Sequence, residues 1–292
     1  MLVRKLREKG VGVERIRVPR RVDTDLTKWE NCQKAVRDVD VVIHAAGRGG
    51  GIGYNMRYPG TIFFENIMIG VQLMEAARRA NVKKFVTVGT VCSYPKMGRV
   101  PFNEEELWEG YPEPTNGPYG MSKKILVTQG EAYRAEFAFN SIHLLLANLY
   151  GPGDDFGAER SHAIPAIMRK VHDARVRKQD LTLWGTGNPS REFLYVDDAA
   201  DGICLATEKY DGVGAVNLGT GVEITIRDLA TKIADLEGYE GKILWDSTFP
   251  DGQPRRLIDT RLAERSFGFK SSTSLDAGLR KTHRWFLDHV VT

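Results

Sequence analysis

Three runs of apolar residues constrain the fold more than any other feature of this sequence. They lie at 40–47, 83–90 and 141–146, and none alternates apolar with polar residues as a strand with one solvated face does. Segments with apolar residues at helical intervals separate them, at 66–80 and around 119–137. Strands that are buried on both faces and alternate with helices predict βαβ units, and therefore an α/β fold with a doubly wound parallel sheet of the Rossmann type.

The pattern becomes looser after Gly151, where loops rich in Gly, Asp and Pro separate shorter elements. The expected elements there are a helix at about 162–174, a strand at 181–184 and a C-terminal helix at about 275–289. We therefore predict a dinucleotide-binding domain at 1–150, with later segments around 190–220 as candidates to join it. A smaller C-terminal α/β domain at 151–292 would bind the substrate.

The beginning of the chain departs from what such a fold leads us to expect. A dinucleotide-binding sheet opens with a strand and a Gly-rich turn whose backbone N–H groups face the pyrophosphate. Here residues 1–9 are typical of the end of an amphipathic helix that Gly10 stops, and 15–18 form a predicted short strand. The glycine run at 49–53 does not replace the turn, because no capped helix is predicted directly after it. We expect the first strand and its turn to be missing, as in a truncated chain or a protein that has lost its phosphate cradle.

Composition places the chain among ordinary globular proteins. Of its 292 residues 42% are hydrophobic and 27% charged, no apolar run is long enough to cross a bilayer, and the charged N-terminus has no signal-peptide core. We therefore expect a cytoplasmic protein without a membrane partner. Cys32, Cys92 and Cys204 are odd in number and far apart, which favours neither a disulfide framework nor a metal site.

Positive charge is concentrated at residues 1–21, where eight Lys and Arg against two Glu give +6, while the whole chain carries only +3. A basic arm for nucleic acid is one interpretation. The segment lacks interleaved aromatic residues, however, and the remainder of the chain is left at −3. We favour a solvated helix face followed by a phosphate contact, and expect no nucleic-acid partner.

Tyr119 and Lys123 place a phenol and an ammonium four residues apart, on one face of a predicted helix. Such a pair usually lies on a solvated face. Here the preceding strand ends in Thr90, at the carboxyl edge of the sheet where ligands of α/β folds bind. A nearby ammonium lowers the pKa of a phenol, so Tyr119 could exchange a proton with a substrate oxygen held by Thr90 while a nicotinamide cofactor exchanges hydride.

Longer motifs surround this pair from about Val39 to the C-terminus. They are Cys92-Ser-Tyr-Pro-Lys96, Glu113-Pro-Thr-Asn116, Asn148-Leu-Tyr-Gly-Pro152, Ser161-His-Ala-Ile-Pro165, the run Trp184 to Phe193, Val196-Asp-Asp198 and the run Pro250 to Arg255. With these motifs the chain resembles the extended short-chain dehydrogenases/reductases, also called the NAD-dependent epimerase/dehydratase family, and among them the GDP-L-fucose synthases.

The resemblance implies a nucleotide-sugar epimerase-reductase. Such an enzyme inverts two carbons flanking the ketone of GDP-4-keto-6-deoxymannose and then reduces the ketone with NADPH, giving GDP-L-fucose. A carbonyl acidifies the neighbouring C–H groups, so inversion needs a base and an acid. The resemblance assigns these roles to Cys92 and His162. The plainer alternatives are a small buried thiol and a helix cap or surface imidazole.

The resemblance also implies residues that bind the nucleotide sugar. It assigns Asn148 to the diphosphate and Trp184 and Arg191 to the nucleotide. Arg256 stands where the family often has Lys, and Lys170 is a weaker candidate. Arginine suits a diphosphate because its planar fork bonds two oxygens at once. The alternatives are a packed indole and surface guanidinium groups.

The residues after the second predicted strand distinguish the cofactor, because NAD enzymes place an acid there and NADP enzymes an arginine. Arg20 and Arg21 follow that strand without an intervening acid, which favours NADP, with NAD as the alternative if both arginines are merely solvated. The resemblance implies further cofactor contacts at Asp25, which could instead be only a helix cap, and at His44, Ala45, Ala46, Tyr119 and Lys123.

Several positions differ from the family pattern: Thr90 replaces Ser, Val91 and Ser93 replace Ser and Ile, Gly120 replaces Ala, and a triple glycine follows Arg48. We expect activity to survive, on the fucose precursor or on a related sugar. Two other functions stay open: an NAD-dependent C4-epimerase, for which Cys92 and His162 would be unnecessary, and a non-catalytic nucleotide-sugar-binding paralogue. The long helices flanking Tyr119 are where we expect a homodimer to form.

Overall fold

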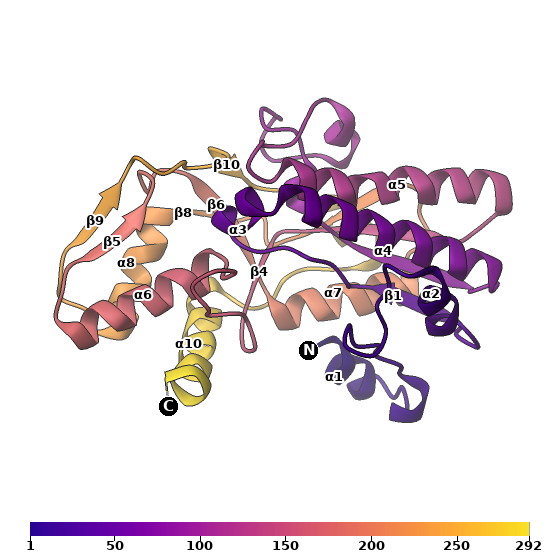
Figure 1. The fold of residues 1–292 in the computed structure, drawn as a ribbon, viewed down its shortest axis with the longest axis horizontal. Helices are drawn as coiled ribbons and strands as arrows, with labels where there is room; N and C mark the ends of the chain where they lie inside the picture. Colours follow the sequence, from indigo (N-terminus) through magenta and orange to yellow (C-terminus); the bar gives the residue numbers. More distant parts are fainter. Residues whose placement is uncertain (292) are drawn as a thin grey trace.

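A parallel sheet forms the centre of the protein in the computed structural model, which describes residues 1–291 (Figure 1). Its strands are β1 (Val41–His44), β2 (Lys84–Thr90), β3 (Ser141–Leu146) and β7 (Ala215–Leu218), in the order β1-β2-β3-β7. Every residue of β3 and β7 is buried, as expected for strands that are covered on both faces. The predicted α/β fold of the Rossmann type is confirmed.

Helices cover both faces of this sheet. α4 (Pro59–Arg79) and α5 (Gly117–Phe137) run side by side over one face, and α7 (Val196–Lys209) lies on the other (Figure 1). Neighbouring residues of β2 point to opposite faces of the sheet. Phe85 lies in an apolar core with Leu126 of α5, and Val86 lies in another with Ile203 of α7. No helix within residues 1–291 has both the length and the apolar character that crossing a membrane requires.

A second apolar core is built mainly by elements of the C-terminal half. These elements are α6 (Ala163–Arg177), β5 (Leu181–Trp184), which pairs with β9 (Ile243–Asp246), α8 (Ile226–Glu237) and α10 (Leu275–Phe286), which a π-helical turn, Leu287–Val291, extends. Between the two cores lie β4 (Asn148–Tyr150), β6 (Ser190–Tyr195), β8 (Glu223–Thr225) and β10 (Arg255–Arg256). α9 (Arg261–Phe267) packs on β7 and α7, within the core of the central sheet. The division of the chain near residue 150 stays a prediction, and β7 carries a later segment back to the central sheet.

Two local predictions for the first part of the chain are wrong. Residues 15–18, predicted as a strand, form none: Arg15 ends a short 3-10 turn, Val13–Arg15, and 16–18 pair with no strand. An extended segment needs a neighbouring strand for its backbone hydrogen bonds, and no strand within residues 1–291 pairs with the outer side of β1, the edge strand. A helix does begin within the glycine run, since α3 (Ile52–Arg57) starts directly after Gly51.

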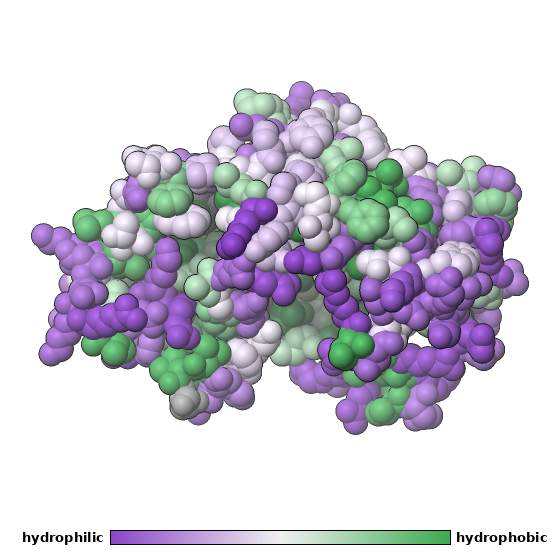
Figure 2. Space-filling model, in the orientation of Figure 1, coloured by the Kyte–Doolittle hydropathy of each residue, from purple (hydrophilic) through white to green (hydrophobic). Residues whose placement is uncertain are grey.

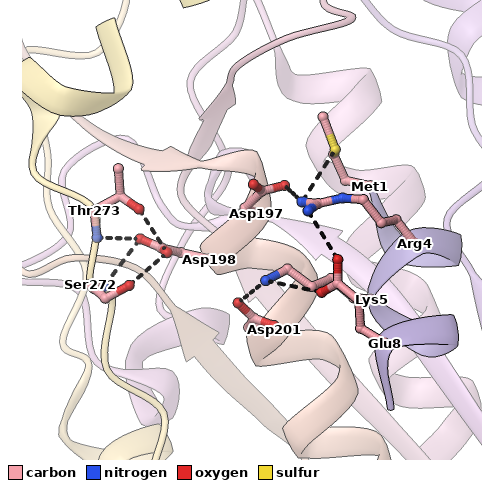
Figure 3. A network of polar contacts seen from close by, with 9 residues as sticks. All are labelled: Met1, Arg4, Lys5, Glu8, Asp197, Asp198, Asp201, Ser272 and Thr273. Atoms are coloured by element: carbon pink, nitrogen blue, oxygen red, sulfur yellow. Dashed lines mark hydrogen bonds and ion pairs between the residues drawn. The ribbon is translucent and has the colours of Figure 1, made fainter. Parts of the chain in front are cut away.

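Ion pairs attach the first helix, α1 (Leu2–Glu8), to α7 (Figure 3). Arg4 donates to Asp197 over 2.5 Å and Lys5 to Asp201 over 2.7 Å. The basic side chains of α1 therefore pair with acidic side chains of α7, and the prediction of a solvated helix face is wrong for Arg4 and Lys5. α2 (Trp29–Ala35) follows and packs on α4.

The next residue of α7, Asp198, binds a different part of the chain (Figure 3). Its buried carboxylate accepts hydrogen bonds from the backbone N–H and the hydroxyl groups of both Ser272 and Thr273, over 2.8–3.1 Å. This segment leads into α10. The adjacent residues Asp197 and Asp198 of α7 therefore bind two distant parts of the chain, α1 and the segment before α10.

We predict that Asp198→Ala lowers the free energy of unfolding by roughly 1–3 kcal/mol, because it removes the buried carboxylate that accepts four hydrogen bonds from Ser272 and Thr273. Urea unfolding followed by circular dichroism measures the change. Asp197→Ala is the matched control, and should cost at most about 1 kcal/mol because its ion pair with Arg4 is largely exposed. Equal losses in the two variants would contradict the assignment.

Candidate active site

A cavity of about 750 Å³ lies between the carboxyl ends of the central strands and the second core. Figure 2 shows the molecular surface hollowed between the lobe that carries α6 and α10 and the lobe that carries α1. All ten residues predicted to act in catalysis or substrate binding line this one cavity: Thr90, Cys92, Tyr119, Lys123, Asn148, His162, Lys170, Trp184, Arg191 and Arg256. The structure thus brings them together from seven helices and strands and the segments between them.

Gly120 brings the catalytic helix close to the end of β2. A Cβ at this position would collide with the backbone carbonyl of Cys92, so α5 can approach the turn Val91–Ser93 only with glycine there. Ser93 reinforces the contact by donating its hydroxyl to the carbonyl of Gly120 over 3.0 Å. Tyr119 and Cys92 therefore face the same space, although α5 and β2 are far apart in sequence.

Lys123 is 5% exposed, and its Nζ donates to the backbone oxygen of Ala46 over 3.0 Å. Burial lowers the pKa of this ammonium to about 8. Burial also raises the pKa of Tyr119, and Lys123 does not lower it as the sequence analysis expected. The ammonium donates its hydrogen bond to the carbonyl of Ala46 instead. Tyr119 is therefore a protonated phenol at neutral pH, the form that can donate a proton.

Thr90 has a defined role at the end of β2. Its Oγ1 accepts a hydrogen bond from the backbone N–H of Cys92 over 3.2 Å and so caps the short turn that holds the thiol. Because this interaction uses the oxygen as acceptor, the hydroxyl proton remains free to be donated to a group in the cavity.

His162 occupies the position before α6 and faces the cavity without capping the helix. Its side chain is exposed to the cavity. Partial desolvation by the surrounding residues lowers its pKa, while the carboxyl groups of Asp154 and Asp155 oppose that shift. Burial also raises the pKa of Asp154, which lines the same cavity. A neutral imidazole with an acid close by is suited to proton exchange.

Arg191 and Arg256 are buried cations in the wall of the same cavity, 7% and 6% exposed. Arg191 donates to the carbonyl groups of Ser190, Asp251 and Gln253, and Arg256 donates to the side-chain oxygen of Gln253 over 2.9 Å. Burial, followed by the charge of Arg256, lowers the pKa of Arg191 to about 9. Neither forms an ion pair within residues 1–291, so an anion entering here would meet uncompensated positive charge.

The remaining predicted substrate residues also line the cavity. The ring of Trp184 stacks on Phe249 with 4.1 Å between centroids, and the Nζ of Lys170 lies 5.4 Å from the indole centroid. Asn148 lines the cavity, but its Nδ2 donates to the carbonyl of Glu192 over 2.8 Å. Its amide is therefore held by the backbone of β6.

The predicted cofactor residues are more dispersed. Ala45 lines the cavity, whereas Ala46 contributes its carbonyl to Lys123 and His44 is buried below them. Asp25 accepts hydrogen bonds from the backbone and hydroxyl of Thr27, a local turn contact, and is not the cap of α2, whose N-cap is Lys28. Arg20 is exposed, and Arg21 pairs with Glu65 beside a smaller hollow of about 320 Å³ that Arg48 and Arg160 also line.

Sequence reasoning missed a pair of buried amides in the cavity wall. Asn55 of α3 donates to the side-chain oxygen of Asn116 over 2.8 Å, and accepts from the backbone N–H of Gly50 over 3.2 Å. Asn116 precedes α5, and its carbonyl accepts from the backbone N–H of Gly120. The glycine run and the catalytic helix are therefore joined, a link that no local pattern signals.

Comparison with known proteins agrees with this geometry. Residues 1–219 match the NAD dependent epimerase/dehydratase family. The chain belongs to this family. A putative GDP-L-fucose synthase 2 of Arabidopsis thaliana is 38% identical over 99% of this chain and 88% of its own length, and the GDP-L-fucose synthase of Escherichia coli is 39% identical over 86% and 81%.

A solved member of similar shape is a GDP-mannoheptose C4 reductase from Campylobacter jejuni with NADP bound. It is 25% identical, with a TM-score of 0.87 over 98% of this chain and 93% of its own. The family resemblance inferred from the motifs is confirmed, and so is the class of enzyme: an NAD(P)-dependent epimerase/reductase. The roles of the individual residues stay predictions.

The lowered pKa of Lys123 predicts a rise in stability with pH. A lysine of an unfolded chain keeps its proton up to about pH 10.4, whereas folded Lys123 loses it near pH 8. Between these values the unfolded state binds more protons, so the free energy of unfolding increases with pH. From about pH 7.5 to about pH 9.5 the wild type should gain roughly 1–2 kcal/mol relative to Lys123→Met in urea unfolding.

The control for this measurement is Lys34→Met, which removes an exposed lysine of α2. The wild type should not gain stability relative to this variant over the same pH range. If the stability of both variants changes with pH as that of the wild type does, the pKa of Lys123 is not lowered on folding.

Proposed function

We propose that this enzyme inverts the two carbons flanking the ketone of a GDP-bound 4-keto-6-deoxyhexose and reduces the ketone with NADPH, forming GDP-L-fucose or a related sugar. The observation that carries the proposal is the cavity itself. Its walls gather a hydroxyl, a thiol, a phenol and an imidazole together with the unpaired cations Arg191 and Arg256. GDP-L-fucose synthases among its relatives support the choice of substrate.

Inversion would proceed by removal and return of a proton at each carbon beside the ketone. The free hydroxyl proton of Thr90 can be donated to the ketone oxygen, which stabilises the enolate that forms. Cys92 and His162 enter the cavity from different elements, the turn after β2 and the start of α6. We assign them the removal and the delivery of the proton.

Reduction would follow in the same site. NADPH supplies the hydride when it is bound. Tyr119, held as a protonated phenol, delivers the proton to the ketone oxygen, and Thr90 orients that oxygen.

The part of the cavity around Lys123 fits such a cofactor. Lys123 is buried without an ion pair within residues 1–291, and a Cβ at Gly47 would lie only 3.0 Å from its Nζ. Glycine thus leaves the ammonium open to a ligand. Arg20 and Arg21 favour the phosphate of NADP over NAD, and the solved reductase with NADP bound supports this choice.

We also propose a homodimer. The two long helices beside the site expose large apolar side chains, since Phe64 of α4 is 60% exposed and Phe63 and Ile125 are 42% exposed each. Figure 2 shows apolar side chains gathered where α4 and α5 run. A second copy packed on these helices would remove this surface from water.

We place the enzyme in the cytosol. Its cysteines Cys32, Cys92 and Cys204 are all free, which is the state that a reducing compartment maintains. The proposed thiol chemistry of Cys92 needs the same state.

Deuterium labelling tests the proposed reaction. With GDP-4-keto-6-deoxymannose and NADPH in heavy water, the wild type should consume NADPH and give a product that carries deuterium at both carbons flanking the reduced one. Cys92→Ser should lose at least tenfold in label incorporation, whereas Tyr119→Phe should lose about 10²–10⁴-fold in the rate of NADPH consumption. Mass spectrometry and absorbance at 340 nm measure the two effects.

The outcomes separate the alternative functions. NADPH consumption without label describes a simple reductase. Inversion at C4 of a nucleotide sugar without label and without net NADPH consumption, unaffected by Cys92→Ala and His162→Ala, describes a C4-epimerase that recycles its cofactor. Binding of the nucleotide sugar without either reaction describes a non-catalytic paralogue. Each of these results would contradict the epimerase-reductase proposal.

For the dimer, Phe64→Glu should convert the protein to a monomer in light scattering coupled to size-exclusion chromatography, because a carboxylate would be buried without a partner. Val176→Glu is the matched control, an exposed apolar residue on α6 away from these helices. A wild type that elutes as a monomer, or loss of the dimer in both variants, would refute this interface.

A further inference from the structure

Arg191 and Arg256 stand side by side in the wall of the cavity. They are register partners on β6 and β10, two parallel strands whose backbones lie about 4.8 Å apart. The side chains of such partners leave the sheet on the same face, where like charges repel each other. In agreement with this, the charge of Arg256 helps to lower the pKa of Arg191. The fold therefore holds two guanidinium groups together against their repulsion.

The hydrogen-bond partners of both arginines are neutral. Arg191 donates to three backbone carbonyls, and one of these is the carbonyl of Gln253, at 2.6 Å. Arg256 donates its Nε to the side-chain Oε1 of the same glutamine over 2.9 Å. No other side-chain hydrogen bond of Arg256 occurs within residues 1–291. Its two terminal nitrogens are therefore left to a ligand in the cavity that Arg256 lines.

Gln253 has its side-chain amide fixed in one orientation. The residue is 1% exposed, and its Nε2 donates to the carbonyls of Pro95 and Lys96 over 3.1 and 3.2 Å. Only the nitrogen of the amide can donate to a carbonyl, so Oε1 must point the other way, toward Arg256. Because Pro95 and Lys96 follow the turn that carries Cys92, the amide also joins this turn to the arginine.

The neutrality of this amide decides how much charge remains for a ligand. A glutamate has nearly the same shape, but its carboxylate would pair with Arg256 and cancel one of the two positive charges. The amide oxygen satisfies the Nε–H without cancelling any charge. Two buried cations without counter-ions are costly, and an anion that carries several negative charges removes that cost. A diphosphate fits best, because its oxygens can accept from both guanidinium groups at once.

We propose that Gln253 is a positioning residue for the diphosphate of the nucleotide sugar: its neutral amide orients Arg256 beside Arg191 and leaves the charge of both for the ligand. This inference rests on the proposed function and specifies how that substrate is held. A carboxylate at position 253 should then harm binding more than an apolar side chain does.

Binding of GDP to the full chain, measured by isothermal calorimetry, tests the inference without turnover. Gln253→Glu should weaken GDP binding at least about tenfold, because the new carboxylate pairs with Arg256 and repels the diphosphate. Gln253→Met should weaken it about three- to tenfold, because Arg256 loses the acceptor that orients it but keeps its charge. A purely structural role predicts the opposite order, since methionine loses all three side-chain hydrogen bonds and glutamate keeps the one with Arg256.

A double-mutant cycle shows whether Gln253 acts through Arg256. Arg256→Met should itself weaken GDP binding at least about tenfold, because it removes one of the two cations. If Gln253 only orients Arg256, adding Gln253→Met to this variant should change the affinity by less than about twofold. Gln33→Glu, an equal change of charge on the exposed face of α2, is the control and should leave GDP binding unchanged.

The possible failures are distinct. A wild type that does not bind GDP overturns the proposed function as well. If the wild type binds GDP, the role of Gln253 alone is overturned by unchanged binding in Gln253→Met, by a larger loss there than in Gln253→Glu, or by an equal loss with and without Arg256. Circular dichroism identifies variants that do not fold. Either position-253 variant decides if the other is unfolded, and loss of folding in both makes the amide structural and refutes the proposal.

Discussion

The close approach of α5 to the end of β2 is the constraint on which the site depends. Gly120 allows this approach because any side chain there would collide with the carbonyl of Cys92. The parallel sheet brings the strand ends to one edge, but only this contact places the phenol of Tyr119 beside the thiol and the hydroxyl of Thr90. Glycine at this position, where the family pattern has Ala, therefore sets how closely the helix approaches the turn in this chain.

Charge is distributed in the cavity at a cost to the free protein. Lys123, Arg191 and Arg256 are buried and lack carboxylate partners within residues 1–291, and burial lowers the pKa values of the first two. Backbone carbonyls compensate only part of that cost. Anionic ligands would offset the remaining cost of burying these cations, which suits a site for a dinucleotide and a nucleotide diphosphate.

Sequence patterns predicted the parallel sheet well because its strands are buried on both faces, and the motifs placed most site residues in one cavity. They failed where the outcome depends on distant partners. Residues 15–18 read as a strand by composition, yet no neighbour supplies hydrogen bonds. The amide pair of Asn55 and Asn116 joins segments about sixty residues apart, and the pKa of Tyr119 follows from its burial, which spacing along a helix does not reveal.

Gly49 has a consequence for how such an enzyme can change during evolution. Every glycine codon is one base away from an alanine codon and from a valine codon. Because neither packing nor backbone conformation demands glycine at this position, a single base change could add a side chain in contact with the ring of Tyr119 while the loop and the catalytic groups stay in place. The surroundings of the catalytic phenol can thus vary between related enzymes by single substitutions.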